Sequence, residues 1–243
     1  AADIEAMGGR ATAFVVGFAA PGHTVTAHAV DLADGMWHEA DLMGAGIVGG
    51  DLVSGPQWVV SVTALGDLGG RTPVRRNGAR PGDVVALIGD LGRSHAGYEL
   101  WRNGIEQFDE LRRRHLVPQP PYGQGEVAAR TGATSMTDVS DGLLADLGHI
   151  ASASEVSVDV SLDLLAADLD AVAAAGAVVN ADVRQWVLGG GEDHALVATF
   201  PADPPPGWRR IGRVLDHPGS QPRVTVDRVP WHGTAGWESF RVD

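Results

Sequence analysis

The acidic segment at residues 137–149, TDVSDGLLADLGH, could bind a metal ion. Asp138 and Asp141 flank Ser140 there, just before apolar residues at helical spacing. One interpretation is an N-cap, in which Ser140 or Asp141 accepts a hydrogen bond from a helix amide. A cap needs only one such group, and two charges about 4 Å apart repel by about 4 kcal/mol at an effective dielectric constant near 20. Because a divalent cation would relieve this repulsion, the cap and the metal site both stay open.

Two more segments place an aspartate among small residues. In GGDLVSG, residues 49–55, two glycines precede Asp51 and would let the backbone come close to a phosphate group. In AADIEAMGG, residues 1–9, Asp3 lies on a predicted helix that ends at the glycines. An ordinary turn after a strand and a solvated helix face are the alternatives, and each is favoured when its segment is taken alone.

Two segments near the C-terminus could recognise a ligand. GGGEDHALVATF, residues 189–200, places Glu192 and Asp193 beside three glycines, which would suit a cationic or hydroxylated ligand or a further metal ion. A hairpin with polar turn residues is the alternative. Further on, GTAGWESF carries Trp237 in an irregular stretch, where the indole could stack on a flat ligand.

Phosphate binding would have to use arginine, backbone amides or metal ions, because the sequence contains no lysine. This excludes a P-loop and the protein-kinase arrangement, which both need a lysine. Arg75, Arg76 and Arg80 lie in a glycine-rich connection, and a guanidinium binds phosphate through its planar fork. IGDLGRSHAG, residues 88–97, could hold phosphate at a helix N-terminus, but it lacks the G-x-G-x-x-G spacing of dinucleotide-binding proteins.

The composition excludes several classes of protein. The chain has 243 residues, of which 44% are hydrophobic, so it can form a sizeable core, yet no apolar run reaches the roughly 20 residues of a membrane span. The net charge of −13 argues against a nucleic-acid binder. The absence of cysteine removes disulfides, thiolate metal sites and cysteine nucleophiles. We therefore expect a cytoplasmic protein that binds neither nucleic acid nor membranes.

The hydrophobic pattern alternates strands with helices, which predicts an α/β fold. The turn-rich segment at 71–83 is the best boundary, so we predict domains at 1–77 and 78–243. The first domain is predicted to contain a strand at 11–20, a helix at 25–43, a strand end with a glycine-rich turn at 44–55 and a strand at 57–68. The second is predicted to contain strands at 84–90, 134–139, 157–165, 208–215 and 223–230, a strand–turn–strand at 186–200, and helices at 92–104, 124–131, 140–155 and 169–179.

Taken together, these segments resemble the thiamine-monophosphate kinase family, part of the wider group typified by aminoimidazole ribonucleotide synthetase. The resemblance covers nearly the whole chain, and its motifs occur in the family's order. They read ADIEAMGG, IVGGDLVSGP, RRNGARPGDVVALIGDLGRSHAGYEL, RRHLVPQPP, DVSDGLLADLGHIASAS, GGGEDHAL, IGRV and GWESF. The resemblance implies a two-domain α/β (α+β) protein that forms a homodimer through its N-terminal domain. It also implies transfer of a phosphoryl group from ATP to thiamine monophosphate, with Mg²⁺ as cofactor.

The resemblance also assigns roles to particular residues. Asp3, Asp51 and Asp141 correspond to Mg²⁺ ligands. Glu192 and Trp237 correspond to contacts with thiamine monophosphate. The contacts with ATP correspond to Gly50, Asp51, Arg76 and Ser140.

The chain departs from the family pattern in two places. His194 stands where the family has a tyrosine after Gly-Glu-Asp. Family members also carry a segment ahead of the position of Ala1, with a Gly-Asp-Asp motif that we expect to complete the metal site, so the N-terminal domain of this chain is predicted to be incomplete. A related purine-pathway ligase of the same fold and a non-catalytic, truncated binding module are the alternatives.

Overall fold

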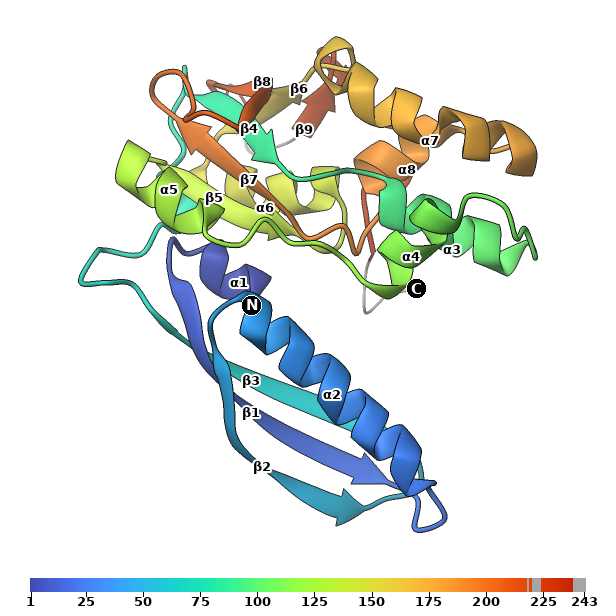
Figure 1. Ribbon diagram of the computed structural model, residues 1–243. Coiled ribbons are helices and arrows are strands. Elements are labelled where there is room, and N and C mark those ends of the chain that lie inside the picture. The colour runs from blue at the N-terminus through green and yellow to red at the C-terminus, as the bar shows by residue number, and fades with distance from the viewer. Residues whose placement is uncertain (218, 220–223, 238–243) are drawn as a thin grey trace.

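The computed structural model describes residues 1–217, 219 and 224–237, and these residues form two sheets (Figure 1). The N-terminal sheet has three strands in the order β2-β1-β3. Its strands are β1 (Arg10–Ala20), β2 (Gly46–Ser54) and β3 (Val59–Asp67). β2 lies parallel to β1 and follows it through helix α2 (Thr26–Leu42), whereas β3 lies antiparallel to β1. These elements confirm the predicted strands at 11–20 and 57–68 and the predicted helix at 25–43.

Helix α2 covers one face of the N-terminal sheet, where Phe14 and Ala40 are buried. The strand register places Val15, Val53, Val59 and Leu65 on the opposite face, and all four side chains are exposed. Asp51 pairs with Gly17 of β1 and therefore lies on this same exposed face. The described chain thus leaves an apolar sheet face open to solvent, which is unusual for a monomeric protein.

The predicted glycine-rich turn at 44–55 is wrong, because β2 continues through Gly49 and Gly50 to Ser54. A Cβ atom at Gly50 would overlap the carbonyl oxygen of Val16 on the neighbouring strand. The glycine therefore lets two strand backbones approach closely, and no turn is needed.

The C-terminal sheet has seven strands in the order β10-β9-β6-β8-β4-β7-β5. All of its pairs are antiparallel except the β6–β9 pair. In β7, Val197 faces the larger hydrophobic core and Leu196 faces a smaller one, so both sides of the sheet are packed. The strands are β4 (Val84–Ile88), β5 (Ser135–Val139), β6 (Ser157–Val160), β7 (Ala195–Phe200), β8 (Arg209–Leu215), β9 (Val224–Val226) and β10 (Val229–Pro230).

Helices cover both faces of this sheet (Figure 1). The larger core contains residues of α3, α6, α7 and α8, and the smaller core lies beneath α1 and α5. The bounds are α3 (Arg93–Arg102), α4 (Asp109–Leu116), α5 (Gln124–Thr131), α6 (Leu143–Ser154), α7 (Ala166–Val179) and α8 (Val183–Gly189), with 3-10 turns η1 (Arg76–Gly78) and η2 (Asp163–Leu165). No helix among the described residues is both long enough and apolar enough to cross a membrane.

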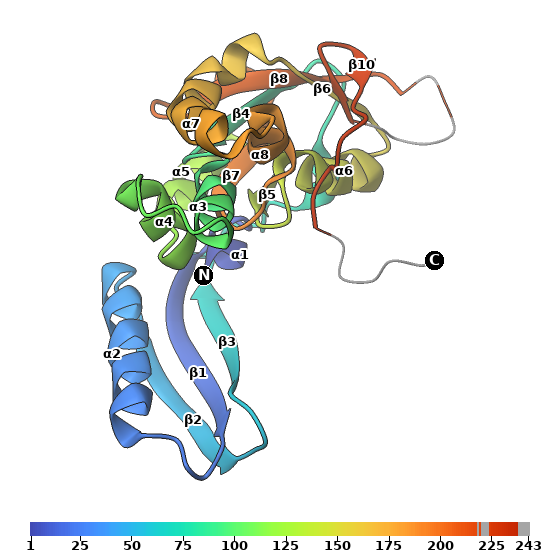
Figure 2. The same ribbon diagram turned by 90° about the vertical axis from the view of Figure 1, so that its right-hand side faces the viewer.

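The short helix α1 (Ala2–Glu5) connects the two sheets (Figure 2). Ile4 packs against Gly66 of β3, and the buried carboxylate of Glu5 accepts hydrogen bonds from the amides of Gly123 and Gly125 at the start of α5. The two hydrogen bonds from these amides are 3.0 and 2.9 Å long. Asp3, on the same helix, therefore lies at the junction of the two sheets.

The fold class is confirmed, but three predicted elements of the C-terminal domain differ. The predicted strand at 157–165 ends at Val160 and is followed by η2, and the predicted strand at 223–230 is the antiparallel pair β9 and β10. The segment ahead of the three glycines was predicted as a strand but forms helix α8, which is capped by the Asp182 carboxylate through the amide of Arg184. Val187 and Leu188 are both fully buried, and consecutive buried residues do not distinguish a strand from a buried helix. The predicted domain boundary after residue 77 falls within η1, between the two sheets, and stays a prediction.

Candidate active site

The acidic segment after β5 forms a tight turn at residues 140–142, in which neither Ser140 nor Asp141 caps a helix. Helix α6 begins after its N-cap residue Gly142, which has no side chain that could accept a hydrogen bond from the first helix amides. Instead, one carboxylate oxygen of Asp146 accepts hydrogen bonds from the amides of Ser140, Asp141 and Gly142, each 3.1 Å long. The side chains of Ser140 and Asp141 are therefore free of capping and half-buried.

The carbonyl groups of the same turn fix both predicted substrate residues. The amide of Glu192 donates to the carbonyl of Ser140 at 2.8 Å, and the amide of Trp237 donates to the carbonyl of Asp141 at 2.9 Å. These bonds bring together residues from three distant parts of the chain. The last motif of the resemblance, residues 236–240, is described only as far as Trp237.

The glycine-rich loop before β7 is held in an uncommon backbone conformation. Glu192 and His194 have φ angles of 66° and 53°, a region that non-glycine residues seldom occupy. Gly191 packs against the carbonyl of Ser140, where a side chain would not fit. Such backbone strain persists where surrounding contacts enforce it and is common at functional sites.

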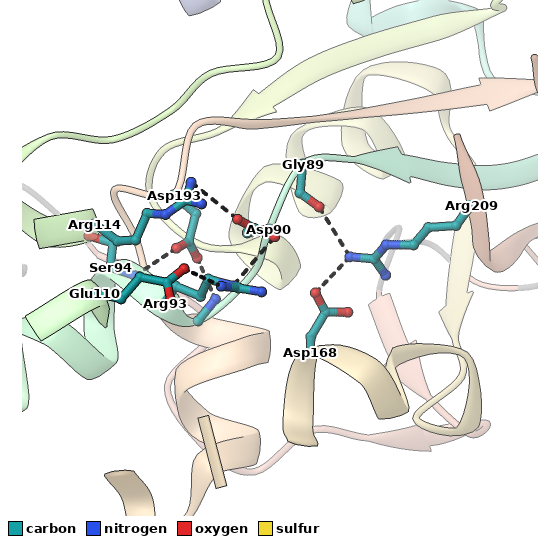
Figure 3. A network of polar contacts seen from close by, with 10 residues as sticks. Gly89, Asp90, Arg93, Ser94, Glu110, Arg114, Asp168, Asp193 and Arg209 are labelled. Carbon is teal, nitrogen blue, oxygen red and sulfur yellow. Dashed lines mark hydrogen bonds and ion pairs between the residues drawn. The ribbon is translucent and has the colours of Figure 1, made fainter. Parts of the chain in front are cut away.

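Asp193 anchors this loop to the start of α3 (Figure 3). Its two carboxylate oxygens accept hydrogen bonds from the amides of Gly92, at 2.6 Å, and Ser94, at 2.9 Å. Burial raises the pKa of Asp193 to about 7, although the hydrogen bonds from the two amides oppose this shift. Asp193 is 9% exposed and both of its carboxylate oxygens accept these hydrogen bonds, so we assign it to support of the loop.

Ion pairs also hold the loop ahead of α3 (Figure 3). Arg93 and Arg114 each lie within 3.4 Å of the Asp90 carboxylate. Arg209 bonds Asp168 at 2.7 Å and also donates to the carbonyl of Gly89. Groups of the segment at 88–97, which could have held phosphate, are thus engaged by Asp193, Arg114 and Arg209 of the same chain.

His194 lies between two acidic groups of the site. Its Nδ1 atom is 3.8 Å from Asp138, and its Nε2 atom is 3.4 Å from Glu192. The Asp138 carboxylate raises the pKa of His194 most, burial opposes this, and Glu192 raises the pKa further. Asp138 belongs to the acidic pair that the sequence offered as a possible metal site, but the resemblance implied only Asp141 of that pair as a ligand.

A cavity of about 520 Å³ brings together four of the predicted site residues, Ser140, Asp141, Glu192 and Trp237. Its volume is in the range of small-molecule sites. Its wall also includes the rings of His95, Tyr98 and His115, from α3 and α4. Neighbouring rings of this wall lie 5.4 to 6.2 Å apart between centroids. This aromatic wall was not predicted, because it forms only where α4 brings His115 next to the α3 rings.

Two further clefts adjoin the junction of the sheets. A cleft of about 410 Å³ contains Asp3, Arg76 and Asp138, so two residues with predicted roles meet the first acid of the pair around Ser140. A cleft of about 490 Å³ lies between α2 and the segment after α4, is lined mainly by apolar residues, and contains Asp3 and His194. Asp3 thus borders both of these clefts.

The structure does not bring Gly50 and Asp51 to these clefts. Asp51 pairs with Gly17, six residues along β1 from Ala11, where α1 packs. At about 3.3 Å per residue this separation is about 20 Å, too far for one ion to join Asp51 to Asp3 of the same chain. Within one copy of the described chain, the predicted metal ligands therefore do not all converge.

Comparison with known proteins agrees with this architecture. Residues 1–68 match the N-terminal domain, and residues 80–219 the C-terminal domain, of AIR synthase related proteins. Thiamine-monophosphate kinase of Mycobacterium tuberculosis H37Rv is 66% identical over 240 residues, which are 99% of this chain and 71% of that protein. The corresponding protein of Corynebacterium glutamicum is 40% identical over 98% of this chain and 73% of its own length.

A solved structure described as AaThiL complexed with AMPPCP and TMP superposes with a TM-score of 0.86. It is 27% identical, and the match covers 98% of this chain and 77% of that one. The sequence relatives and the fold agree with the resemblance found from the motifs. The chain therefore belongs to the thiamine-monophosphate kinase family of the AIR synthase related proteins and is a kinase.

Proposed function

We propose that the chain catalyses phosphorylation of thiamine monophosphate by ATP, giving thiamine diphosphate through direct in-line transfer. The observation that carries the proposal is the single cavity shared by Ser140, Asp141, Glu192 and Trp237. Relatives that share most of the chain are thiamine-monophosphate kinases, and the AaThiL structure was solved with AMPPCP and TMP.

The cavity suits a flat cationic ring. Trp237 and Tyr98 offer aromatic faces, Glu192 offers a negative charge, and no arginine lines the cavity among the described residues. Burial lowers the pKa of His95, so this imidazole stays neutral at physiological pH and does not repel a cation. The thiazolium ring of thiamine monophosphate is such a cation.

Oxygen donors in the clefts fit Mg²⁺, which prefers carboxylates and phosphate oxygens. Asp3 and Asp138 border one cleft, and Asp141 projects from the adjoining turn. When bound, the ion neutralises charge on the phosphates. We assign Asp3 and Asp141 to this role, as the resemblance implies, and add Asp138. Arg76 lies beside Asp3 and Asp138 and would bind a phosphate oxygen of ATP.

The transfer itself needs no protein nucleophile and no strong base. The acceptor is a phosphate oxygen that already carries negative charge at neutral pH. The protein therefore contributes position and charge balance, which dominate catalysis of phosphoryl transfer. Ser140 would contact ATP from the turn, while Glu192 and Trp237 orient the acceptor.

The remote position of Asp51 leads us to propose a homodimer. Asp51 and Gly50 lie on the N-terminal sheet, and Asp51 shares its exposed face with the apolar side chains Val15, Val59 and Leu65. A second copy that packs on this face would cover the apolar surface and bring Asp51 to the partner's clefts. The roles of Gly50 and Asp51 as ATP contacts, and of Asp51 as a metal ligand, depend on that assembly. A cytoplasmic location is part of the same proposal.

Two substitutions test the proposal. Asp141→Asn should abolish thiamine diphosphate formation from ATP and thiamine monophosphate without changing the circular dichroism spectrum. Trp237→Ala should chiefly raise the KM for thiamine monophosphate, whereas Trp101→Ala, at an exposed position of α3 outside the cavity, should leave the KM unchanged. Full activity in Asp141→Asn would contradict the metal role. ATP turnover stimulated by formylglycinamidine ribonucleotide would favour the purine-pathway ligase, and failure to bind Mg-ATP in calorimetry would favour a non-catalytic module.

A further inference from the structure

Both the carbonyl groups and the amides of the turn at residues 140–142 form hydrogen bonds. Its carbonyl groups accept the amides of Glu192 and Trp237, which fix the two residues assigned to the acceptor. Its three amides converge on a single oxygen of Asp146, each at 3.1 Å. Asp146 lies in the first turn of α6 and is 2% exposed. The buried Asp146 side chain therefore holds all three amides of the turn that carries Ser140 and Asp141.

The geometry does not favour Asp146 as a metal ligand. Ligand atoms of Asp141, Asp146 and His149 lie within 4.8 Å of one another, so the possibility has to be considered. However, one carboxylate oxygen of Asp146 already accepts three hydrogen bonds and the residue is 2% exposed, so only its second oxygen is left for an ion. The cavity is lined by Ser140 and Asp141, and Asp146 is not among the described residues that line it. Asp146 lies behind the turn, on the side away from the cavity.

We propose that Asp146 is a positioning residue, which holds the Ser140–Gly142 turn so that Asp141 faces the metal and phosphates while Glu192 and Trp237 face the acceptor. This inference rests on the proposed function for what those residues bind. The effect of Asp146 on the shape of the turn follows from the hydrogen bonds alone. A buried amide without an acceptor is strongly disfavoured, so loss of the carboxylate would force the turn to open toward water.

The test compares Asp146→Ala and Asp146→Asn with a matched control, Asp159→Ala. Asp159 is also a buried aspartate, and it accepts hydrogen bonds from the Thr225 hydroxyl and the Arg228 amide, both 2.7 Å long. It lies on β6, outside the cavity. Its loss should lower stability without changing the turn, which separates a general loss of packing from a positional effect.

The first measurement is hydrogen exchange of the full chain without magnesium. Amides 140–142 should exchange slowly in the wild type and at least tenfold faster in Asp146→Ala, while amides of β5 stay protected. Asp146→Asn keeps one acceptor oxygen and should give intermediate exchange. Asp159→Ala should leave these amides as slow as in the wild type.

The second measurement is a magnesium titration of activity. Asp146→Ala should need at least tenfold more Mg²⁺ for half-maximal activity and show a lower kcat, and Asp146→Asn should recover part of both. If Asp146→Ala does not fold, Asp146→Asn and Asp159→Ala carry the comparison.

Two results would overturn the inference. One is protection of amides 140–142 that survives loss of the carboxylate, with stability lowered as in Asp159→Ala. The other is loss of Mg²⁺ binding in Asp146→Asn as complete as in Asp141→Asn with the amides still protected, which would make Asp146 a ligand. A wild-type chain that fails to phosphorylate thiamine monophosphate would refute the proposed function, while the exchange data would still decide the role of Asp146 in the turn.

Discussion

Substitution of Asp193 by asparagine should change stability in a direction that depends on pH. The Asp193 carboxylate anchors the loop that carries Glu192, and each of its oxygens accepts one amide of the α3 N-terminus. Asparagine keeps one acceptor oxygen and places a donor opposite the other amide. The loss of one buried hydrogen bond costs about 1–3 kcal/mol.

The buried negative charge of Asp193 lowers the stability of the wild type at high pH, which opposes the cost of the lost hydrogen bond in the variant. Burial raises the pKa of Asp193 from 3.8 to about 7 in the folded protein. A carboxyl whose pKa is higher in the folded state favours folding below pH 3.8, and this contribution is lost as the pH rises through 7. Three pH units at about 1.36 kcal/mol each amount to about 4 kcal/mol, of which about 3 kcal/mol falls between pH 5 and pH 8.5.

Relative to the wild type, Asp193→Asn should therefore be about 3 kcal/mol less stable at pH 5 than at pH 8.5. At pH 8.5 it should be equally stable or more stable, because the variant buries no charge. Urea unfolding followed by tryptophan fluorescence at both pH values measures the difference. Asp182→Asn is the control, since hydrogen bonds from Arg184 lower the pKa of this exposed carboxyl and its ionisation is complete throughout that range. A stability difference for Asp193→Asn that is the same at both pH values would refute the reasoning.

The N-terminal sheet gives two further predictions. Gly50→Ala should lower the melting temperature, because the added Cβ would overlap a carbonyl of β1, whereas Gly49→Ala has open space and should melt near the wild type; equal melting of the two would contradict the close approach. Leu65→Asp should convert a dimer into a monomer in sedimentation velocity, and Leu42→Asp, at an exposed site on α2, should not. A Leu65→Asp dimer would exclude the exposed sheet face as the interface.

The sequence predicted those elements in which one periodicity dominates. Helix α2 and strands β1 and β3 have clear apolar spacing, and their bounds agree within a few residues. Helix α8 was missed because it is short and its last four residues are all buried, so its sequence carries little periodic contrast. β2 was misread because glycine is typical of turns, and only the neighbouring backbone shows that Gly50 serves a close strand contact.

The site could be predicted only in part, because motif residues are recognised by type while their supports depend on the fold. Ser140, Asp141, Glu192 and Trp237 were predicted from the family motifs, and the structure places them around one cavity. Asp146 looks like an ordinary acid on a helix surface until three amides are seen to point at it. The tertiary fold also sets the separation of Asp3 from Asp51, which no spacing in the sequence could indicate.

His194 shows how the chain balances the negative charge of its site. The carboxylates of Asp138 and Glu192 lie on either side of its ring, at 3.8 and 3.4 Å, and together they raise its pKa. A protonated imidazole would then offset one of the two carboxylates. The tyrosine that the family carries at this position could donate a hydrogen bond but would add no positive charge. Because a metal ion bound by Asp138 would compete for that carboxylate, protonation of His194 and magnesium binding should oppose each other.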